Sequence, residues 1–159
     1  MNTFNIIRRD IALNSPSTSG NDLIEHALAN IDSKYSIIGQ FFVTTPFIKA
    51  DTIKKSFDLL LANKDKTSCF GLYEVHDRFW HNNKPVNHDI KKLVGTQYMK
   101  PLMREAGFYV FKRSAFYKER SRVTESFVTF NVDSVECVDI DTKLDFLYAK
   151  SVCELLSES

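Results

Sequence analysis

Apolar residues recur along this chain in two patterns of spacing. Short runs rich in β-branched and aromatic residues predict strands, whereas apolar residues three and four positions apart predict amphipathic helices. The nearly continuous apolar run SIIGQFFV at 36–43 is typical of a strand buried on both faces of a sheet. The expected strands are 4–8, 36–43, 68–75, 106–112, 127–131 and 135–140, and the expected helices are 20–30, 50–63 and 141–156.

The alternation of these two kinds of segment predicts an α/β layered domain, with helices on both faces of one sheet. No internal repeat or low-complexity tract divides the chain, so we expect a single domain over 1–159. The stretch 76–104 breaks the pattern, since it contains Pro85 and Pro101 and has no sustained period. We expect it to leave the sheet as a hairpin with short helices, suited to a binding surface or a subunit contact.

Charge and composition narrow the possible partners. The chain has 21 Lys and Arg residues against 20 Asp and Glu residues, so it lacks the strong positive field of a general nucleic-acid or anionic-membrane binder. No apolar run approaches the roughly 20 residues that cross a bilayer, and the sequence MNTFNIIRRD lacks the apolar region of a signal peptide. We therefore expect a cytoplasmic protein with no nucleic-acid and no membrane partner.

Cysteine and glycine spacing limits the chemistry further. The three cysteines are widely spaced and form no CxxC pair, which predicts reduced packing residues and neither disulfides nor a zinc site. The five glycines lie at least 12 positions apart. No glycine-rich turn can therefore wrap backbone amides around a phosphate, and any nucleotide chemistry in these residues is incomplete or unconventional.

The string VDIDTKLD at 138–145 carries the best local signal for chemistry. On the expected strand, Asp139 and Asp141 project from the same face, and their oxygens can converge on a hard cation such as Mg²⁺. The alternative is that Asp141 or Thr142 caps the last helix, with Asp145 completing a T-x-x-D capping box. Spacing alone favours capping, and the two roles are compatible.

Two further segments are candidates for binding. In 6–22, two arginines and a hydroxyl-rich loop precede the helix expected near Gly20, which suits an anion or a base edge. The alternative is a surface loop in which Ser19 or Asn21 caps that helix. The Thr-Thr-Pro string at 44–46 either lines the mouth of a pocket or simply ends a buried strand.

Taken in order, these segments resemble the acylneuraminate cytidylyltransferases, also called CMP-sialic acid synthetases. The resemblance covers nearly the whole chain, and its most specific part is the terminal string. It implies a nucleotide-diphospho-sugar-transferase-like sheet, CTP and an acidic nine-carbon sugar as substrates, Mg²⁺ as cofactor, and CMP-sugar and pyrophosphate as products. The strings that carry it are RRDIALNSPSTSGNDLIEHAL, IIGQFFVTTPF, GTQYMKPLMREAGFYVFKR and VDIDTKLDFLYAK.

The resemblance also implies a role for particular residues. Asp139 and Asp141 would be the catalytic metal ligands, and 76–104 would be the dimerisation arm of a homodimer. Arg8, Arg9, Ser17, Thr18 and Ser19 would face the nucleotide, while Thr44, Thr45, Gln97 and Arg104 would face the acceptor sugar.

Departures from the family pattern bear on activity. Family members begin with a strand and a basic, glycine-rich loop that grips the triphosphate, and this chain starts after it. Phe42 stands where the family has a glutamine for the sugar, and neither Gly95 nor Thr96 can replace a family arginine nearby. We expect negligible turnover from the chain alone unless the N-terminal segment comes from a second chain. The alternatives are an inactive remnant, a dimeric sugar- or metal-binding module, or a natural product that is longer.

Overall fold

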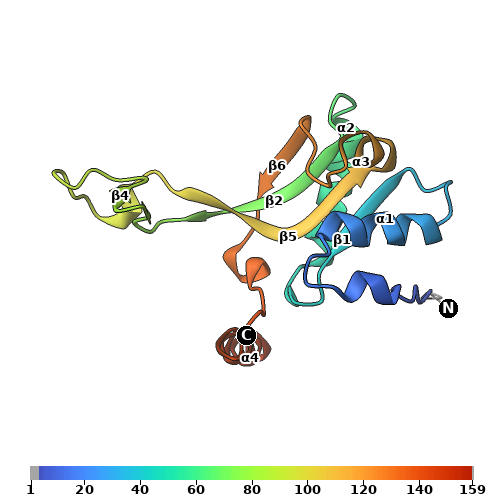
Figure 1. The fold of residues 1–159 in the computed structure, drawn as a ribbon. Coiled ribbons are helices and arrows are strands. Elements are labelled where there is room, and N and C mark those ends of the chain that lie inside the picture. The colour runs from blue at the N-terminus through green and yellow to red at the C-terminus, as the bar shows by residue number, and fades with distance from the viewer. Residues whose placement is uncertain (1–3, 159) are drawn as a thin grey trace.

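The computed structural model describes residues 4–158 around one mixed sheet. In space the strands run in the order β1, β5, β2, β6 (Figure 1). The long strand β5 (Leu102–Lys112) is antiparallel to β1 (Ile37–Phe41) and to β2 (Ser68–Val75), and β6 (Phe127–Asn131) is parallel to β2. Strand β5 therefore joins the two halves of the sheet and passes through the middle of the core.

Helices cover both faces of the sheet, as expected from the sequence. Because side chains alternate along a strand, Tyr109 and Phe111 of β5 face helix α1 (Gly20–Asn30), whereas Val110 faces helix α2 (Ala50–Ala62). The two buried clusters built on these faces confirm the layered α/β architecture. The α1 side holds Ile24, Leu28, Phe70, Tyr109, Phe111 and Phe116, and the α2 side holds Leu60, Cys69 and Val110.

Between β2 and β5 the chain leaves the sheet as a hairpin arm, visible at the left of Figure 1. Its two short strands, β3 (Trp80–His81) and β4 (Lys84–Pro85), pair across Asn82 and Asn83. Both asparagines have positive φ, at 48° and 60°, as a two-residue hairpin turn requires. A short 3₁₀ helix, Thr96–Tyr98, follows. The expected hairpin is present, with one short helix in the described arm, and residues 102–104 belong to β5.

Two expected strands are wrong. Residues 4–8 have no regular secondary structure and are exposed, because no neighbouring strand pairs with them. Residues 134–137 form a 3₁₀ helix instead of a strand. There the Asp133 side chain accepts a hydrogen bond from the backbone N–H of Val135 (2.8 Å), and the Glu136 carboxylate accepts one from the N–H of Lys49 at the start of α2 (2.9 Å). The first bond is local and turns the backbone away from a ladder, and the second ties the turn to a distant segment.

Two helices complete the chain. Helix α3 (Arg113–Glu119) follows β5 without a loop and packs Phe116 against the α1 face. Helix α4 (Lys143–Ser157) stands apart from the sheet, seen end-on in Figure 1, and Ala149 is its single buried residue within the described chain. None of the helices in residues 4–158 combines the length and the apolar character needed to cross a membrane.

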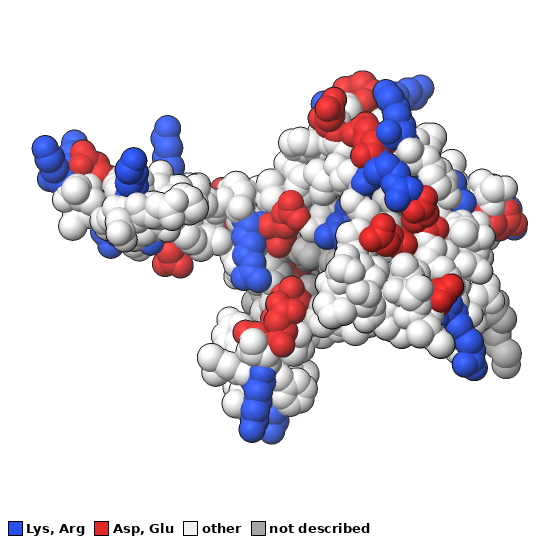
Figure 2. Space-filling view, viewed as in Figure 1, with Lys and Arg blue, Asp and Glu red and all other residues white. Residues whose placement is uncertain are grey.

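The expected packing role holds for two of the three cysteines and is wrong for the third. Cys69 and Cys137 are buried packing residues, whereas Cys153 on α4 is exposed. In the space-filling view, basic and acidic side chains are interspersed over the body and the arm (Figure 2), in keeping with the balanced composition.

Candidate functional site

Two adjoining hollows lie where β5 passes the turn after β1 and the segment after residue 137. Their volumes are about 310 Å³ and about 300 Å³, and three residues, Arg104, Cys137 and Asp139, line both. We call the two together the polar cavity. The first hollow also contains Phe42, Thr45, Glu105, Gly107, Tyr109 and Arg122, and the second contains Tyr73, Ser134, Val138, Asp145 and Tyr148.

Backbone hydrogen bonds bring two distant segments together at this cavity. The N–H of Ile140 donates to the carbonyl oxygen of Thr44 (2.9 Å). The N–H and the hydroxyl of Thr45 both donate to the carbonyl oxygen of Phe42, at 3.2 Å and 2.9 Å, which closes a turn directly after β1. Thr45 and Asp139 therefore share the cavity, whereas Thr44 contributes its carbonyl to the link between the segments.

Gly107 allows β5 to pass close to that turn. Its φ is +70°, and a Cβ at this position would lie 2.8 Å from Cγ2 of Thr45. The pairing of β5 with β2 shifts register here, between the pairs Phe70–Tyr109 and Leu72–Glu105. A bulge with glycine in the left-handed region bends the strand, and here it directs Glu105 and Arg104 toward the cavity.

Replacing Gly107 with Ala is expected to lower the free energy of unfolding by about 1–3 kcal/mol, because alanine is strained at positive φ and its Cβ would press on Thr45. Urea unfolding measures the change. Gly20→Ala is the matched control, since Gly20 begins helix α1 and lacks a positive φ. Equal losses in the two variants would contradict the assigned strain.

Arg104 is the cation shared by the two hollows. Its Nη1 donates to the hydroxyl of Tyr73 (3.3 Å), and its guanidinium carbon lies 5.9 Å from the Tyr73 ring centroid. Within residues 4–158 it forms no ion pair with a carboxylate. Burial raises the pKa of the adjacent Cys137 thiol to about 11, despite the opposing charge of Arg104. Cys137 is therefore a neutral packing group and not a nucleophile.

Asp139 has an unsatisfied oxygen in the cavity. Its Oδ1 is buried and has no hydrogen-bond partner in the described structure. Buried polar atoms are nearly always satisfied, so an orphan of this kind calls for a donor or a cation. Among all the residues singled out from the sequence, this carboxylate shows the clearest need for a ligand.

Asp141 does not accompany Asp139 into the cavity. It is exposed and lines neither hollow, because residues 138–141 are not a strand and the expected period-two alignment does not apply. The capping interpretation is confirmed. Oδ2 of Asp145 accepts bonds from the N–H and the hydroxyl of Thr142, at 2.8 Å and 2.7 Å, and these bonds hold the pKa of Asp145 below its usual value. Glu105 and Asp145, not Asp141, are the other carboxylates that line the polar cavity with Asp139.

The residues present fit part of a magnesium site. Within the described residues, no group of three or more His, Cys, Asp or Glu side chains can hold a metal ion. Magnesium is usually bound through one or two protein carboxylates, with water and substrate phosphates completing its shell. The orphan oxygen of Asp139 suits one such ligand position. Mg²⁺ binding, by Asp139 and Asp141 together or by Asp139 alone, stays a prediction.

The residues expected to face the nucleotide lie away from the polar cavity. Arg8 and Arg9 are exposed, and the ring of His26 donates to the carbonyl oxygen of Arg8 (3.1 Å). Ser19 caps α1 in a capping box with Asp22, so the capping alternative holds there too. Ser17, Thr18 and Gln97 also lie outside both hollows, with Gln97 exposed on the arm.

Sequence reasoning missed Arg122, which comes from the loop between α3 and β6. Its guanidinium carbon lies 4.1 Å from the ring centroid of Tyr109 and 5.4 Å from that of Phe42. The Tyr109 hydroxyl donates to the Glu105 carboxylate. Burial and this hydrogen bond raise the pKa of Tyr109 to about 12. The string KERSRVTES around Arg122 shows only a charged loop, so nothing in the sequence signals its position.

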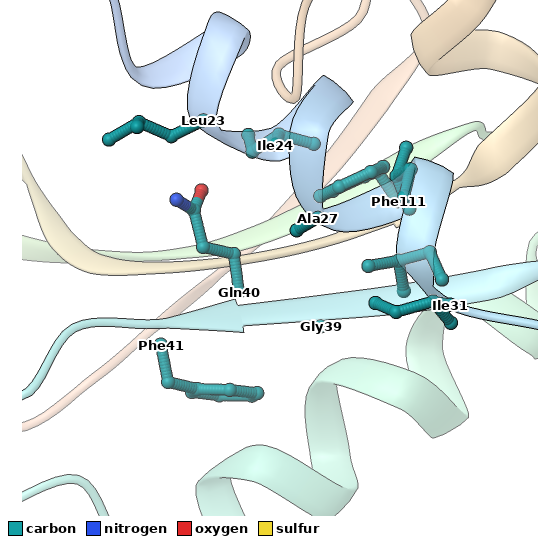
Figure 3. A pocket seen from close by; sticks show the side chains of 10 residues that line it. Leu23, Ile24, Ala27, Ile31, Gly39, Gln40, Phe41 and Phe111 are labelled. Atoms are coloured by element: carbon teal, nitrogen blue, oxygen red, sulfur yellow. The ribbon is translucent and has the colours of Figure 1, made fainter. Parts of the chain in front are cut away.

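A separate hollow of about 240 Å³ lies between α1 and β1 (Figure 3). Its walls are apolar, with Leu23, Ile24, Ala27 and Phe111 among them, and Gln40 contributes an amide. None of its lining residues is titratable. It therefore contains no group for acid–base catalysis and no positive charge that could bind a phosphate.

Comparison with known proteins identifies the fold. No family model and no curated protein sequence matches the chain. Among solved structures, it is similar to 4-diphosphocytidyl-2C-methyl-D-erythritol synthase from Anaerococcus prevotii, with a TM-score of 0.61 and 11% identity over 87% of this chain and 68% of that one. At this identity the likeness shows the fold alone, an α/β fold shared with that synthase.

Proposed function

We propose that this chain serves CTP-dependent nucleotidyl transfer to an acidic sugar, and that the polar cavity binds the acceptor. The fold likeness to a diphosphocytidyl-sugar-alcohol synthase supports the nucleotidyl part. One observation carries the acceptor part: within residues 4–158, an arginine without an ion pair and a carboxylate with an unpartnered oxygen line the same cavity. A sugar acid supplies a carboxylate for Arg104 and a hydroxyl that donates to Asp139.

In the proposed reaction, a hydroxyl oxygen of the acceptor attacks the α-phosphorus of CTP. A bond forms between them, the bond from the α-phosphorus to the bridging oxygen breaks, and pyrophosphate leaves. Arg104 and Thr45 would hold the acceptor, while Asp139 would accept the proton of the attacking hydroxyl. Bound Mg²⁺ would offset the charge that grows on the phosphates.

A binding module without turnover is the second candidate. The observation in its favour is that Arg8, Arg9 and the hydroxyls of 17–19 lie outside the polar cavity. Positioning and charge stabilisation supply most of the catalysis in phosphoryl transfer. We therefore expect negligible pyrophosphate release from this chain alone. We also propose a homodimer through the arm, whose exposed apolar side chains Trp80, Ile90 and Leu93 support a subunit contact.

The test combines a turnover assay with binding measurements. The protein is incubated with CTP, Mg²⁺ and a panel of nonulosonic acids while pyrophosphate is measured, and calorimetry follows the binding of each acid. Binding of an acid that Asp139→Asn weakens and the matched variant Asp141→Asn leaves unchanged would support the acceptor site. Turnover near ordinary enzymatic rates, about 1 per second or more, would show a complete enzyme and contradict our expectation of negligible release.

Two other outcomes bear on the choice between the candidates. Tight binding of CTP without any acid would count against the binding module. Failure of every acid to bind would contradict the proposed acceptor site as a whole.

A further inference from the structure

Arg122 is held rigidly at the wall of the polar cavity. Its guanidinium stacks over Tyr109 at 4.1 Å and near Phe42 at 5.4 Å, and its Nη1 donates to Oε1 of Gln40 (3.1 Å). Gln40 lies on β1, Tyr109 lies on β5 and Phe42 directly follows β1, and together they fix the plane of the guanidinium. A planar donor that is already ordered loses little conformational freedom when it binds an anion.

Arg122 has no close carboxylate partner among the described residues. In residues 4–158 neither Arg122 nor Arg104 forms an ion pair. Tyr109 stays a neutral phenol at ordinary pH, since its pKa is raised to about 12, and the Glu105 carboxylate is engaged by the Tyr109 hydroxyl. A guanidinium has several N–H donors, and Gln40 accepts from only one of its nitrogens, Nη1.

Arg120, two positions earlier in the same loop, is an arginine whose charge is paired within the protein. It forms an ion pair with Glu25 of α1 and lies outside the cavity. Arg122 instead lines a cavity together with Arg104, which likewise forms no ion pair in the described part of the chain. The two residues carry the same charge on the same loop, so they form a matched pair for testing.

The acidic groups of the cavity define the ligand class. Glu105 and Asp139 would repel a compact anion with charge on every side. A small polyhydroxy acid carries its negative charge at one end and hydroxyl donors elsewhere, so its carboxylate can face the arginines while a hydroxyl donates to the orphan oxygen of Asp139. We propose that Arg122 is a specificity-determining residue whose guanidinium binds the carboxylate of this acceptor. The inference rests on the proposed function.

The experiment compares an acid with its neutral ester. Wild type, Arg122→Gln, Arg122→Lys and the control Arg120→Gln are titrated by calorimetry with N-acetylneuraminic acid, with its methyl ester and with inorganic pyrophosphate. Thermal unfolding of each variant verifies the fold. We expect Arg122→Gln to raise the Kd of the acid at least about tenfold and to leave the Kd of the ester within about twofold. Arg122→Lys should retain part of the affinity, and Arg120→Gln should behave as wild type.

Several results would overturn the inference. One is an unchanged Kd for the acid in Arg122→Gln, and another is an equal loss of affinity for the acid and the ester. A third is that Arg120→Gln loses as much affinity for the acid as Arg122→Gln. A fourth is a loss of affinity for pyrophosphate alone, which would assign Arg122 to the nucleotide. If wild type binds neither acid nor ester, the proposed acceptor site fails together with the inference. If wild type binds the acid and Arg122→Gln binds it equally well, the inference alone fails.

Discussion

Replacing Arg104 with Gln is expected to raise the Kd for a sugar acid roughly 10- to 100-fold, because the variant loses a charge-assisted hydrogen bond to the ligand carboxylate. Arg104 lines both hollows of the polar cavity, and its guanidinium donates to the Tyr73 hydroxyl. Calorimetry at fixed ionic strength gives the Kd. Thermal unfolding should change little, since Arg104 is exposed and makes no ion pair in the described chain.

Lys100→Gln is the matched control for Arg104. Lys100 is exposed, lies four positions earlier and lines neither hollow. The same loss of affinity in Lys100→Gln would show a diffuse charge effect and not a contact. An unchanged Kd in Arg104→Gln would show that the carboxylate of the sugar acid does not contact Arg104.

Phe111→Ala is expected to lower the free energy of unfolding by about 3–5 kcal/mol, the usual cost of a large cavity in a packed core. Phe111 is fully buried on β5 and packs with Phe116, Ile24 and Leu28 on the α1 face. Its removal leaves a void where three elements meet, and close-packed neighbours relax into such a void only in part. Urea unfolding followed by circular dichroism measures the change.

Phe4→Ala provides the comparison, because the Phe4 side chain is 93% exposed. The same chemical truncation there should change the free energy of unfolding by less than about 0.5 kcal/mol. A loss below about 1 kcal/mol in Phe111→Ala would mean that the α1 face is loosely packed, against the burial described above.

Most of the fold follows from the local pattern of apolar residues. The expected strands 68–75 and 127–131 and the expected helix 20–30 have the bounds that the structure shows, because their periodicity and their end signals agree. The Thr142 capping box likewise begins α4 close to the expected position. Segments whose propensity and tertiary environment point the same way are predictable from sequence.

The errors arise where partners that are distant in sequence decide the structure. Residues 4–8 have strand composition but no neighbouring strand to pair with. The sequence predicts a strand over 135–140. In the structure Glu136 accepts a hydrogen bond from the N–H of Lys49 at the start of α2 and forms part of a 3₁₀ helix. Only the fold shows that Arg122 reaches Tyr109. The cavity lining thus combines Thr45, Arg104 and Asp139, which the sequence singled out, with residues that no motif marks.

Helix α4 gives the polar cavity a wall of low local stability. A helix of 15 residues with one buried side chain depends on its own turns and its cap, and helices of about this length are marginal in water when little packing supports them. Subglobal opening of α4 can therefore precede global unfolding. Asp145 and Tyr148 would leave the cavity in that opened species. The apparent affinity for any ligand contacting them then scales with the fraction of molecules in which α4 is formed.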